Sequence, residues 1–425
     1  MTAGPNPPFP ELLRTFTRIG FLSFGGPAGQ IALMHKEIVE DRGWVDEGAY
    51  LRALNLCHLL PGPEAQQLAT WIGWRLHGVR GGLAAGLLFV VPGSAVMLGL
   101  SLLYALAAGL AWFAALFLGI KAAVLAIVAQ ALIRVGKRAL GTRFKFALAA
   151  VAFVALSLAK IPFPLVIFGS GLVGFAVGGR RPKWLDAHVF DQQTAPAAST
   201  RSLAKSTLAT VAVWLVIWAA PMALIAATLG TDHVLWQVGA FFSKLAVVTF
   251  GGAYAVLAYM AQAAVEQYHW LAPGEMADGL GLAESTPGPL IMVTQFVGFL
   301  AAWRAPAPFT PLLAGLLGAG LTTWVTFAPC FLWIFACAPW MDRLERMPAL
   351  QSALAAVTAA VVGVIANLAL WFALHVLLSG GELTGFDWRA AVIAGLAALM
   401  LFKLKRGVIE VLGVSALAGL LLSQM

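Results

Sequence analysis

Long apolar runs alternate with short charged segments over almost the whole chain. Many of the runs hold about twenty residues, which is the length that a helix needs to cross a hydrocarbon core of ~30 Å. Several runs are short or interrupted by glycine and proline, so the pattern leaves open that a few are re-entrant hairpins. About thirteen candidate transmembrane segments follow, near residues 15–34, 50–73, 82–106, 111–133, 146–159, 161–178, 209–229, 238–260, 277–302, 309–338, 353–378, 389–402 and 407–423.

The composition supports a membrane protein and argues against a soluble one. Of the 425 residues, 60% are hydrophobic and 11% are charged, whereas a soluble domain carries about 25% charged residues. We therefore predict an all-α integral membrane protein that is surrounded by the lipid bilayer. The net charge is +8, but the basic residues stand in short loops and form no stripe. Nucleic-acid binding is therefore not expected.

Motifs for a metal, a nucleotide or a disulfide framework are missing from the sequence. There is no HExxH and no GxxxxGK[ST], and the three cysteines lie in apolar runs without a CxxC. The scattered histidines argue against a convergent set of catalytic groups. We expect no cofactor, no metal ligand and no catalytic residue. An enzyme or an assembly subunit that is embedded in the membrane and transports nothing remains an alternative to a transporter.

One polar stretch divides the chain. Residues 179–207 contain five basic residues and a Gln-Gln-Thr-Ala-Pro-Ala-Ala-Ser-Thr segment without apolar periodicity, which is typical of a flexible connector. This predicts a first transporter repeat at 1–178, a cytoplasmic linker at 179–207, an extra transmembrane span at 208–230 and a second, inverted repeat at 231–425.

The charges of the loops predict an orientation, because basic loops stay in the cytoplasm. Five basic residues crowd positions 134–145, whereas the matching loop of the second half carries Glu382 and Asp387 against Arg389. Conversely, the loop at 403–406 is basic where its first-half counterpart holds only Lys160. We therefore expect a cytoplasmic N-terminus, residues 35–48 outside, and a periplasmic C-terminus, with the extra span inverting the second half.

Two rare tripeptides recur at one spacing. Phe24-Gly25-Gly26 returns as Phe250-Gly251-Gly252, and Pro61-Gly62-Pro63 returns as Pro287-Gly288-Pro289, in both cases 226 residues later. After an insertion of eleven residues the register resumes, pairing Pro92 with Pro329. The sequence therefore predicts two homologous repeats, each with two Gly/Pro-broken helices. Inverted repeats that are interrupted at matching positions point to the substrate site of a secondary transporter.

The breaks offer a way to bind an anion inside a membrane. A helix that restarts at a break exposes backbone N–H groups with partial positive charge. The paired glycines allow non-helical dihedral angles, and Pro27 suits the first turn of the restarting helix. Brought together about a pseudo-two-fold axis, the four breaks would surround one oxyanion. We therefore place the substrate path at Phe24, Gly25, Gly26, Pro27, Pro61, Gly62, Pro63, Phe250, Gly251, Gly252, Pro287, Gly288 and Pro289.

Polar side chains near the breaks are further candidates for the path. Hydroxyls and amides stand beside the breaks at Ser23, Thr249, Gln66 and Gln295; they either line the path or bond their own backbone. Arg18 and Lys244 either attract anions at the two entrances or mark the ends of spans. Glu64 and Glu284 are candidates for proton coupling, with a place just outside the hydrocarbon as the alternative. Lys121 stands inside an apolar run and is assigned to the path or to a structural counter-charge.

These motifs resemble the chromate ion transporter family in its long, two-domain form. The resemblance rests on residues 16–27 and 60–69 of the first half and on residues 250–252 and 284–289 of the second. It implies export of chromate from the cytoplasm, chromate resistance and coupling to the proton-motive force in a bacterial inner membrane. Sulfate or another oxyanion remains an alternative substrate, and a homodimer is left open. The second half departs at Ala253 and Leu290, where the first has Pro27 and Glu64, so the halves are expected to contribute different ligands.

Overall fold

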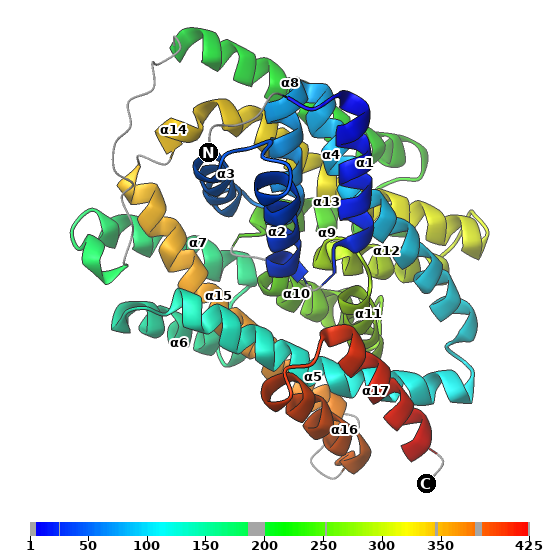
Figure 1. Cartoon of the computed structure of the whole chain (residues 1–425). Helices are drawn as coiled ribbons and strands as arrows, with labels where there is room; N and C mark the ends of the chain where they lie inside the picture. The colour runs from blue at the N-terminus through cyan, green and yellow to red at the C-terminus, as the bar shows by residue number, and fades with distance from the viewer. Residues whose placement is uncertain are drawn as a thin grey trace.

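The computed structural model describes residues 6–24, 26–185, 200–250, 253–344, 347–378 and 385–423. Over these residues the chain is built of helices, with a single isolated bridge between Leu378 and Phe386. The predicted all-α class is confirmed (Figure 1). The first half contains α1 Phe9–Leu22, α2 Gly26–His35, α3 Glu47–Leu59, α4 Glu64–Ala107, α5 Ala111–Ala139, α6 Arg143–Ser157 and α7 Phe163–Gly178.

The second half repeats this order after the separate helix α8 Thr200–Thr228. The π-helical turn at Lys36–Glu40, between α2 and α3, has a counterpart at Ala263–Gln267 between α10 and α11. In the same way α11 corresponds to α3, and α15 corresponds to α5. The helices are α9 Val234–Val248, α10 Ala253–Gln262, α11 Pro273–Ser285, α12 Val293–Arg304, α13 Pro311–Cys337, α14 Met341–Leu344, α15 Pro348–Leu377, α16 Trp388–Ala398 and α17 Val408–Leu422.

Helix α4 consists of two pieces that fold back on each other. His77 and Gly78 leave helical geometry, and the φ of Gly78 is +60°, a value that glycine adopts without steric cost. Beyond this kink the two pieces pack through glycines, because a Cβ added to Gly73 would lie 2.1 Å from the carbonyl oxygen of Gly81. The first piece spans residues 64–76 and the second spans 79–107.

The first broken segment of each half folds back on itself and forms a helical hairpin. Arg18 of α1 lies 3.5 Å from the carboxylate of Glu37, which follows α2. The break lies between these two residues in the sequence, so they could not meet if α2 continued straight on from α1. In the second half the ammonium group of Lys244, on α9, lies 5.8 Å from the ring centre of Tyr259 on α10.

The second broken segment of each half folds back in the same way. The ion pair of Glu275 with Arg304 joins the start of α11 to the end of α12 at 2.5 Å, and Gly279 packs against the ring of Phe296. In the first half α3 packs against α4.

Four of the candidate spans therefore form helical hairpins, a possibility that the sequence pattern had left open. They are the spans near residues 15–34, 50–73, 238–260 and 277–302. The segment after α2 therefore returns alongside α1, since Glu37 lies beside Arg18, whereas the expected place of residues 35–48 outside assumed a straight crossing.

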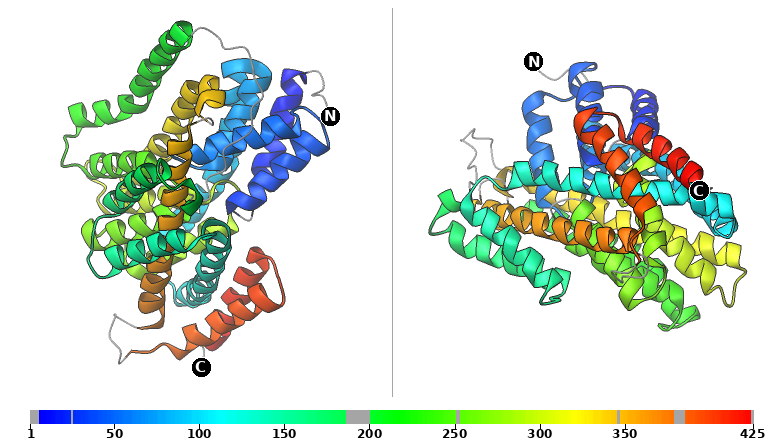
Figure 2. Two further views of the ribbon diagram at one scale, coloured as in Figure 1. Left: turned by 90° about the vertical axis from the view of Figure 1, so that its left-hand side faces the viewer. Right: turned by 90° about the horizontal axis from the view of Figure 1, so that it is seen from below.

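The two halves are interlocked through their last helices. Helices α6 and α7 pack against α15 of the second half, and α16 and α17 pack against α5 of the first (Figure 2). Glycines permit the close approach: a Cβ on Gly419 would lie 2.4 Å from the carbonyl oxygen of Ala115, and one on Gly174 would lie 2.6 Å from that of Ser352. Such backbone contacts through small residues are the usual way in which membrane helices associate.

Within the described ranges, five helices are long and apolar enough to cross a membrane, namely α4, α5, α8, α13 and α15. Helix α8 lies at the upper edge of Figure 1, and only 6% of its most apolar stretch is buried. It is attached to the second half, since the indole N–H of Trp324 donates to the carbonyl of Ile217 at 3.2 Å. An apolar helix with so little buried surface is suited to lipid.

Candidate functional site

The breaks of the two halves are joined by a reciprocal pair of backbone hydrogen bonds. The N–H of Gly62 donates to the carbonyl oxygen of Thr249, and the N–H of Gly288 donates to that of Ser23, both at 2.9 Å. Each half thus gives a donor from its Pro-Gly-Pro element and an acceptor from the residue before its Phe-Gly-Gly element. The φ angles of Gly62 and Gly288 are +121° and +88°, which favour glycine at both donors.

The breaks lie beside the middle of long helices. A Cβ on Gly288 would lie 3.2 Å from the Cα of Gly93, which is midway between the kink and the end of α4. With a rise of ~1.5 Å per residue, about 20 Å of helix extends from Gly93 in each direction. Gly62 packs in the same way against Cys330, which takes the place of Gly93 in the second half. Both Pro-Gly-Pro elements therefore lie well inside the molecule.

Helices begin at these breaks. Helix α2 begins at Gly26, whose φ is +70°, and α4 begins at Glu64 directly after Pro63. In the second half α10 begins at Ala253, and a 3₁₀ turn that leads into α12 begins at Leu290. The first turn of a helix presents backbone N–H groups without a partner in that helix. Gly25, Gly251 and Gly252 lie outside the described residues.

The two hydroxyls that precede the Phe-Gly-Gly elements bond their own helices. Ser23 Oγ donates to the carbonyl of Ile19, and Thr249 Oγ1 donates to that of Leu245, both at 2.6 Å. Both residues are buried. Of the two alternatives left by the sequence, the structure shows the bond to the residue's own backbone.

Three glutamines of the first half surround the breaks, and the sequence singled out only Gln66. Gln30 Nε2 donates to the carbonyl of Gly288 at 2.6 Å, and Gln67 Nε2 donates to that of Pro61 at 2.7 Å. Gln66 donates to Thr70 at 3.1 Å. All three amide oxygens are buried without a hydrogen-bond partner among the described residues. Comparison of the two repeats could have revealed Gln30 and Gln67, because valine stands at both matching positions of the second half.

Each half contributes a buried carboxylate near a break. Glu64 Oε1 lies 3.8 Å from His58 Nδ1, and its second oxygen has no hydrogen-bond partner in the described part of the chain. Glu284 accepts a hydrogen bond of 2.7 Å from the hydroxyl of Tyr254. Their exposed fractions are 7% and 4%. Carboxyls so placed, inside the protein rather than at its surface, have the position that a proton carrier needs.

The basic candidates lie away from the breaks and differ in their partners. Arg18 is 61% exposed and pairs with Glu37, whereas Lys244 lies beside the ring of Tyr259 and has no ion pair within the described ranges. Lys121 pairs with Asp278 on α11, at 3.4 Å. Asp278 was missed by the sequence analysis.

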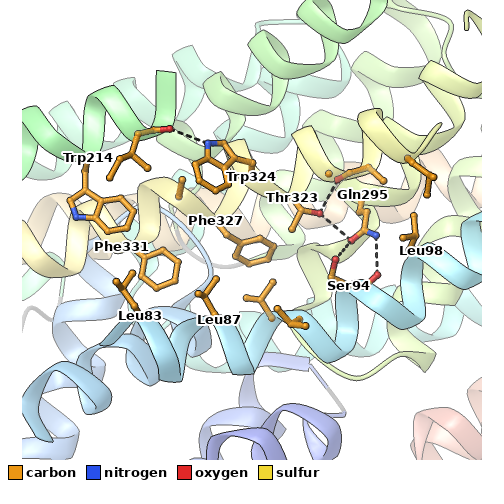
Figure 3. A pocket seen from close by; sticks show the side chains of 17 residues that line it. Leu83, Leu87, Ser94, Leu98, Trp214, Gln295, Thr323, Trp324, Phe327 and Phe331 are labelled. Atoms are coloured by element: carbon orange, nitrogen blue, oxygen red, sulfur yellow. Dashed lines mark hydrogen bonds between the residues drawn. The ribbon is translucent and has the colours of Figure 1, made fainter. Parts of the chain in front are cut away.

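Gln295 lies at the polar end of an apolar pocket of about 370 Å³ between α4, α8, α12 and α13 (Figure 3). Its amide oxygen accepts from Ser94 at 2.8 Å and from Thr323 at 3.1 Å, and its Nε2 donates to the carbonyl of Ser94 at 2.9 Å. The remaining lining is mainly leucine, valine, phenylalanine and tryptophan. Without a cation in its lining, the pocket is a poor site for an oxyanion.

The sequence profile of the chromate transporter family matches this chain at residues 10–175 and 236–420, which are the two repeated halves. The chain belongs to the chromate transporter family. It is similar to the chromate transport protein of Pseudomonas aeruginosa, with 31% identity over 97% of this chain and 92% of that one. It is also similar to the chromate transport protein of Cupriavidus metallidurans, with 30% identity over 84% of this chain and 80% of that one. An uncharacterized transporter of Methanocaldococcus jannaschii is 25% identical over 94% of this chain.

No solved structure matches this member of the chromate transporter family. The matched ranges begin within α1 and α9 and end within α7 and α17, so both interlocked halves carry the family's sequence pattern. Helix α8 lies between the two ranges. The family assignment, which the sequence motifs predicted, is thus confirmed, and it supports transport of chromate across a membrane.

Proposed function

We propose that this protein exports chromate from the cytoplasm and that the oxyanion passes between the four helix breaks. The reciprocal bonds of Gly62 and Gly288 carry the proposal, because they bring the breaks of both halves together. The helix starts at Gly26, Glu64, Ala253 and Leu290 provide backbone donors that suit a tetrahedral dianion. The halves contribute differently, since a carboxylate stands at the start of α4 where the second half has a leucine.

The membrane potential supports the outward direction. An inside-negative potential is worth about 2.3 kcal/mol per charge and 100 mV, so a dianion gains roughly twice that on leaving the cell. Glu64 and Glu284 are our candidates for coupling this movement to protons, because both are buried close to the breaks. Export of this kind would confer resistance to chromate on a bacterium that carries the protein in its inner membrane.

The fold supports an inverted arrangement with nine crossing helices: the second piece of α4, α5, α6, α7, α8, α13, α15, α16 and α17. The four hairpins enter and return without crossing. One half then contributes four crossings, α8 adds one, and the second half contributes four more, so the two termini lie on opposite sides. The charges of the loops assign the N-terminus to the cytoplasm and the C-terminus to the periplasm. Under this arrangement the basic loop at 134–145 stays cytoplasmic, and residues 35–48 also lie on the cytoplasmic side.

Everted membrane vesicles test the proposal, because their interior corresponds to the periplasm. Vesicles with the protein should accumulate radiolabelled chromate under an energised gradient, and protein-free vesicles should not. Excess sulfate distinguishes the alternative, an oxyanion carrier that prefers sulfate: labelled sulfate would then accumulate and chromate would compete poorly. If neither anion enters the vesicles under any gradient, the protein does not transport oxyanions.

A further inference from the structure

A buried carboxylate away from the breaks is held by a tyrosine and a lysine. Asp278 of α11 is 1% exposed. Its Oδ2 accepts a hydrogen bond of 2.7 Å from the hydroxyl of Tyr104 at the end of α4 and lies 3.4 Å from the ammonium group of Lys121 on α5. Its Oδ1 has no hydrogen-bond partner in the described part of the chain. One acceptor of this carboxylate is therefore free to take a proton.

The pair lies at a close crossing of α11 and α5. A Cβ on Gly281 would lie 2.2 Å from a methyl of Ile120, and one on Gly274 would lie 2.9 Å from the ammonium group of Lys121. Three aromatic rings from two helices pack against Tyr104 edge-on, namely Phe113 and Phe117 of α5 and Phe296 of α12. The tyrosine is thus fixed by packing, and with it the orientation of Asp278.

The two partners differ in how far they are exposed. The side chain of Lys121 is 28% exposed, whereas that of Asp278 is 2% exposed. Lys121 can therefore meet an incoming anion while the carboxylate behind it cannot. The neighbouring charges are already engaged, because Glu275 on α11 pairs with Arg304 of α12, and Glu284 further along α11 is held by Tyr254.

The pair joins α5 of the first half to α11 of the second, and the matching helices α15 and α3 carry no such pair. In the register of the repeat, Arg52 takes the place of Asp278 and Thr358 takes the place of Lys121. A buried ion pair adds little to stability compared with apolar packing, because both charges lose their hydration. Its presence on only one of the two matching helix pairs between the halves therefore favours a role in which the pair opens and closes.

We propose that Lys121 and Asp278 form a proton-linked oxyanion site, which rests on the proposed transport of an oxyanion. A dianion binds the ammonium group of Lys121 in place of Asp278, and a proton from water binds Oδ1 of the released carboxylate. Before binding, the charges of Lys121 and Asp278 sum to zero. With the dianion bound the sum would be minus two, and the proton on Asp278 reduces it to minus one. Oxyanion binding and proton uptake are thus thermodynamically linked.

Binding of radiolabelled chromate to the purified full-length protein, with proton uptake recorded in weakly buffered solution, tests this linkage. Chromate itself titrates, so each variant is compared with wild type at the same pH, where this contribution is equal. For Asp278→Asn we expect binding at least as tight as in wild type, with a proton uptake smaller by up to about one proton per chromate bound. Lys121→Met should bind chromate at least about tenfold more weakly. Glu410→Gln removes an exposed carboxylate that pairs with Arg406, and it should behave like wild type.

The double variant Lys121→Met/Asp278→Asn removes both charges and so avoids an unpaired buried charge if a single variant fails to fold. It should bind weakly and without the additional proton uptake. The inference is overturned if Asp278→Asn keeps the proton uptake of wild type, or if either Lys121→Met or the double variant keeps the affinity of wild type. If wild type itself binds no oxyanion, the proposed function fails, and this inference fails with it.

Discussion

Gly62 donates its backbone N–H to the carbonyl oxygen of Thr249 at 2.9 Å, and 226 residues further on Gly288 makes the same bond to Ser23. Each bond links a Pro-Gly-Pro turn of one half to the Phe-Gly-Gly turn of the other. The carbonyls of Ser23 and Thr249 follow the ends of α1 and α9, where helical partners are missing. The bonds therefore satisfy backbone groups that would otherwise be unpaired in the interior, and they hold both halves in one relative position.

The interlocking of the halves predicts that two glycines on one helix, α17, differ in how well they tolerate replacement by a larger residue. Gly419→Val should lower the free energy of unfolding by about 1–3 kcal/mol, because even a Cβ at this position would lie 2.4 Å from the carbonyl of Ala115. Gly413→Val on the same helix has open space at its Cβ and should be nearly neutral. Thermal unfolding in detergent measures both. Equal loss in the two variants would contradict the close packing of α17 on α5.

The two basic residues beside the first hairpins should contribute unequally to transport. Arg18 lies beside the carboxylate of Glu37, which also pairs with Arg42, so Arg18→Gln leaves one cation at this carboxylate and should keep the KM for chromate within about twofold. Lys244 has no carboxylate partner among the described residues, so Lys244→Gln should raise KM by roughly two- to fivefold, as expected for an exposed charge. Initial rates at varied chromate concentration measure the difference. A larger effect at Arg18 than at Lys244 would show that the ion pair with Glu37 opens during transport.

Removing a proton-coupling carboxyl should separate exchange from accumulation. Glu64→Gln or Glu284→Gln should reduce accumulation driven by a pH gradient at least about tenfold, while exchange of chromate for chromate at equal pH continues. Glu410→Gln is the matched control, because this carboxylate is exposed and pairs with Arg406. Vesicles assayed with and without the gradient give both quantities. If both glutamate variants keep gradient-driven accumulation, neither residue carries the proton.

The inverted arrangement predicts opposite sides for two matching loops. Cysteines introduced at Gly141 and at Gly385 should react with an impermeant maleimide from opposite faces of the membrane, with the first labelled only in everted vesicles. Cys57 and Cys330 are buried and should add little background, and Cys337, which is only partly buried, is replaced by serine in both variants. Labelling of both positions from one face would exclude an inverted repeat.

Much of this architecture could be predicted from the sequence, because a gap-free repeat of Gly/Pro breaks leaves few other ways to build two matching halves. What the sequence did not predict was that each broken segment folds back. Hydropathy is the same for a straight crossing and for a hairpin, and the ion pair between Arg18 and Glu37 becomes visible only in three dimensions. The glutamines at 30 and 67 were missed because they stand one turn into helices that otherwise appear as apolar spans.

Asp278 was missed for a related reason. It stands in a segment of small and apolar residues, five positions after the start of α11, and nothing in its neighbourhood indicates a partner. Its two partners are more than 150 residues away in the sequence, on helices whose packing no local pattern reveals. Lys121 was recognised as unusual because a basic residue inside an apolar run is costly, but its role depends on the carboxylate that it meets.

The most direct test of the central claim compares transport by Gly288→Ala with transport by Gly99→Ala. Alanine at position 288 must adopt a positive φ, which costs about 1–2 kcal/mol, and its Cβ would press on Gly93 at the point where the breaks meet. Gly99 lies on the same long helix as Gly93, with nothing within 4 Å of an added Cβ. At equal amounts of protein in everted vesicles, we predict that Gly288→Ala loses at least about nine tenths of chromate uptake and that Gly99→Ala keeps it. Uptake at the wild-type rate in Gly288→Ala would contradict a substrate path between the breaks.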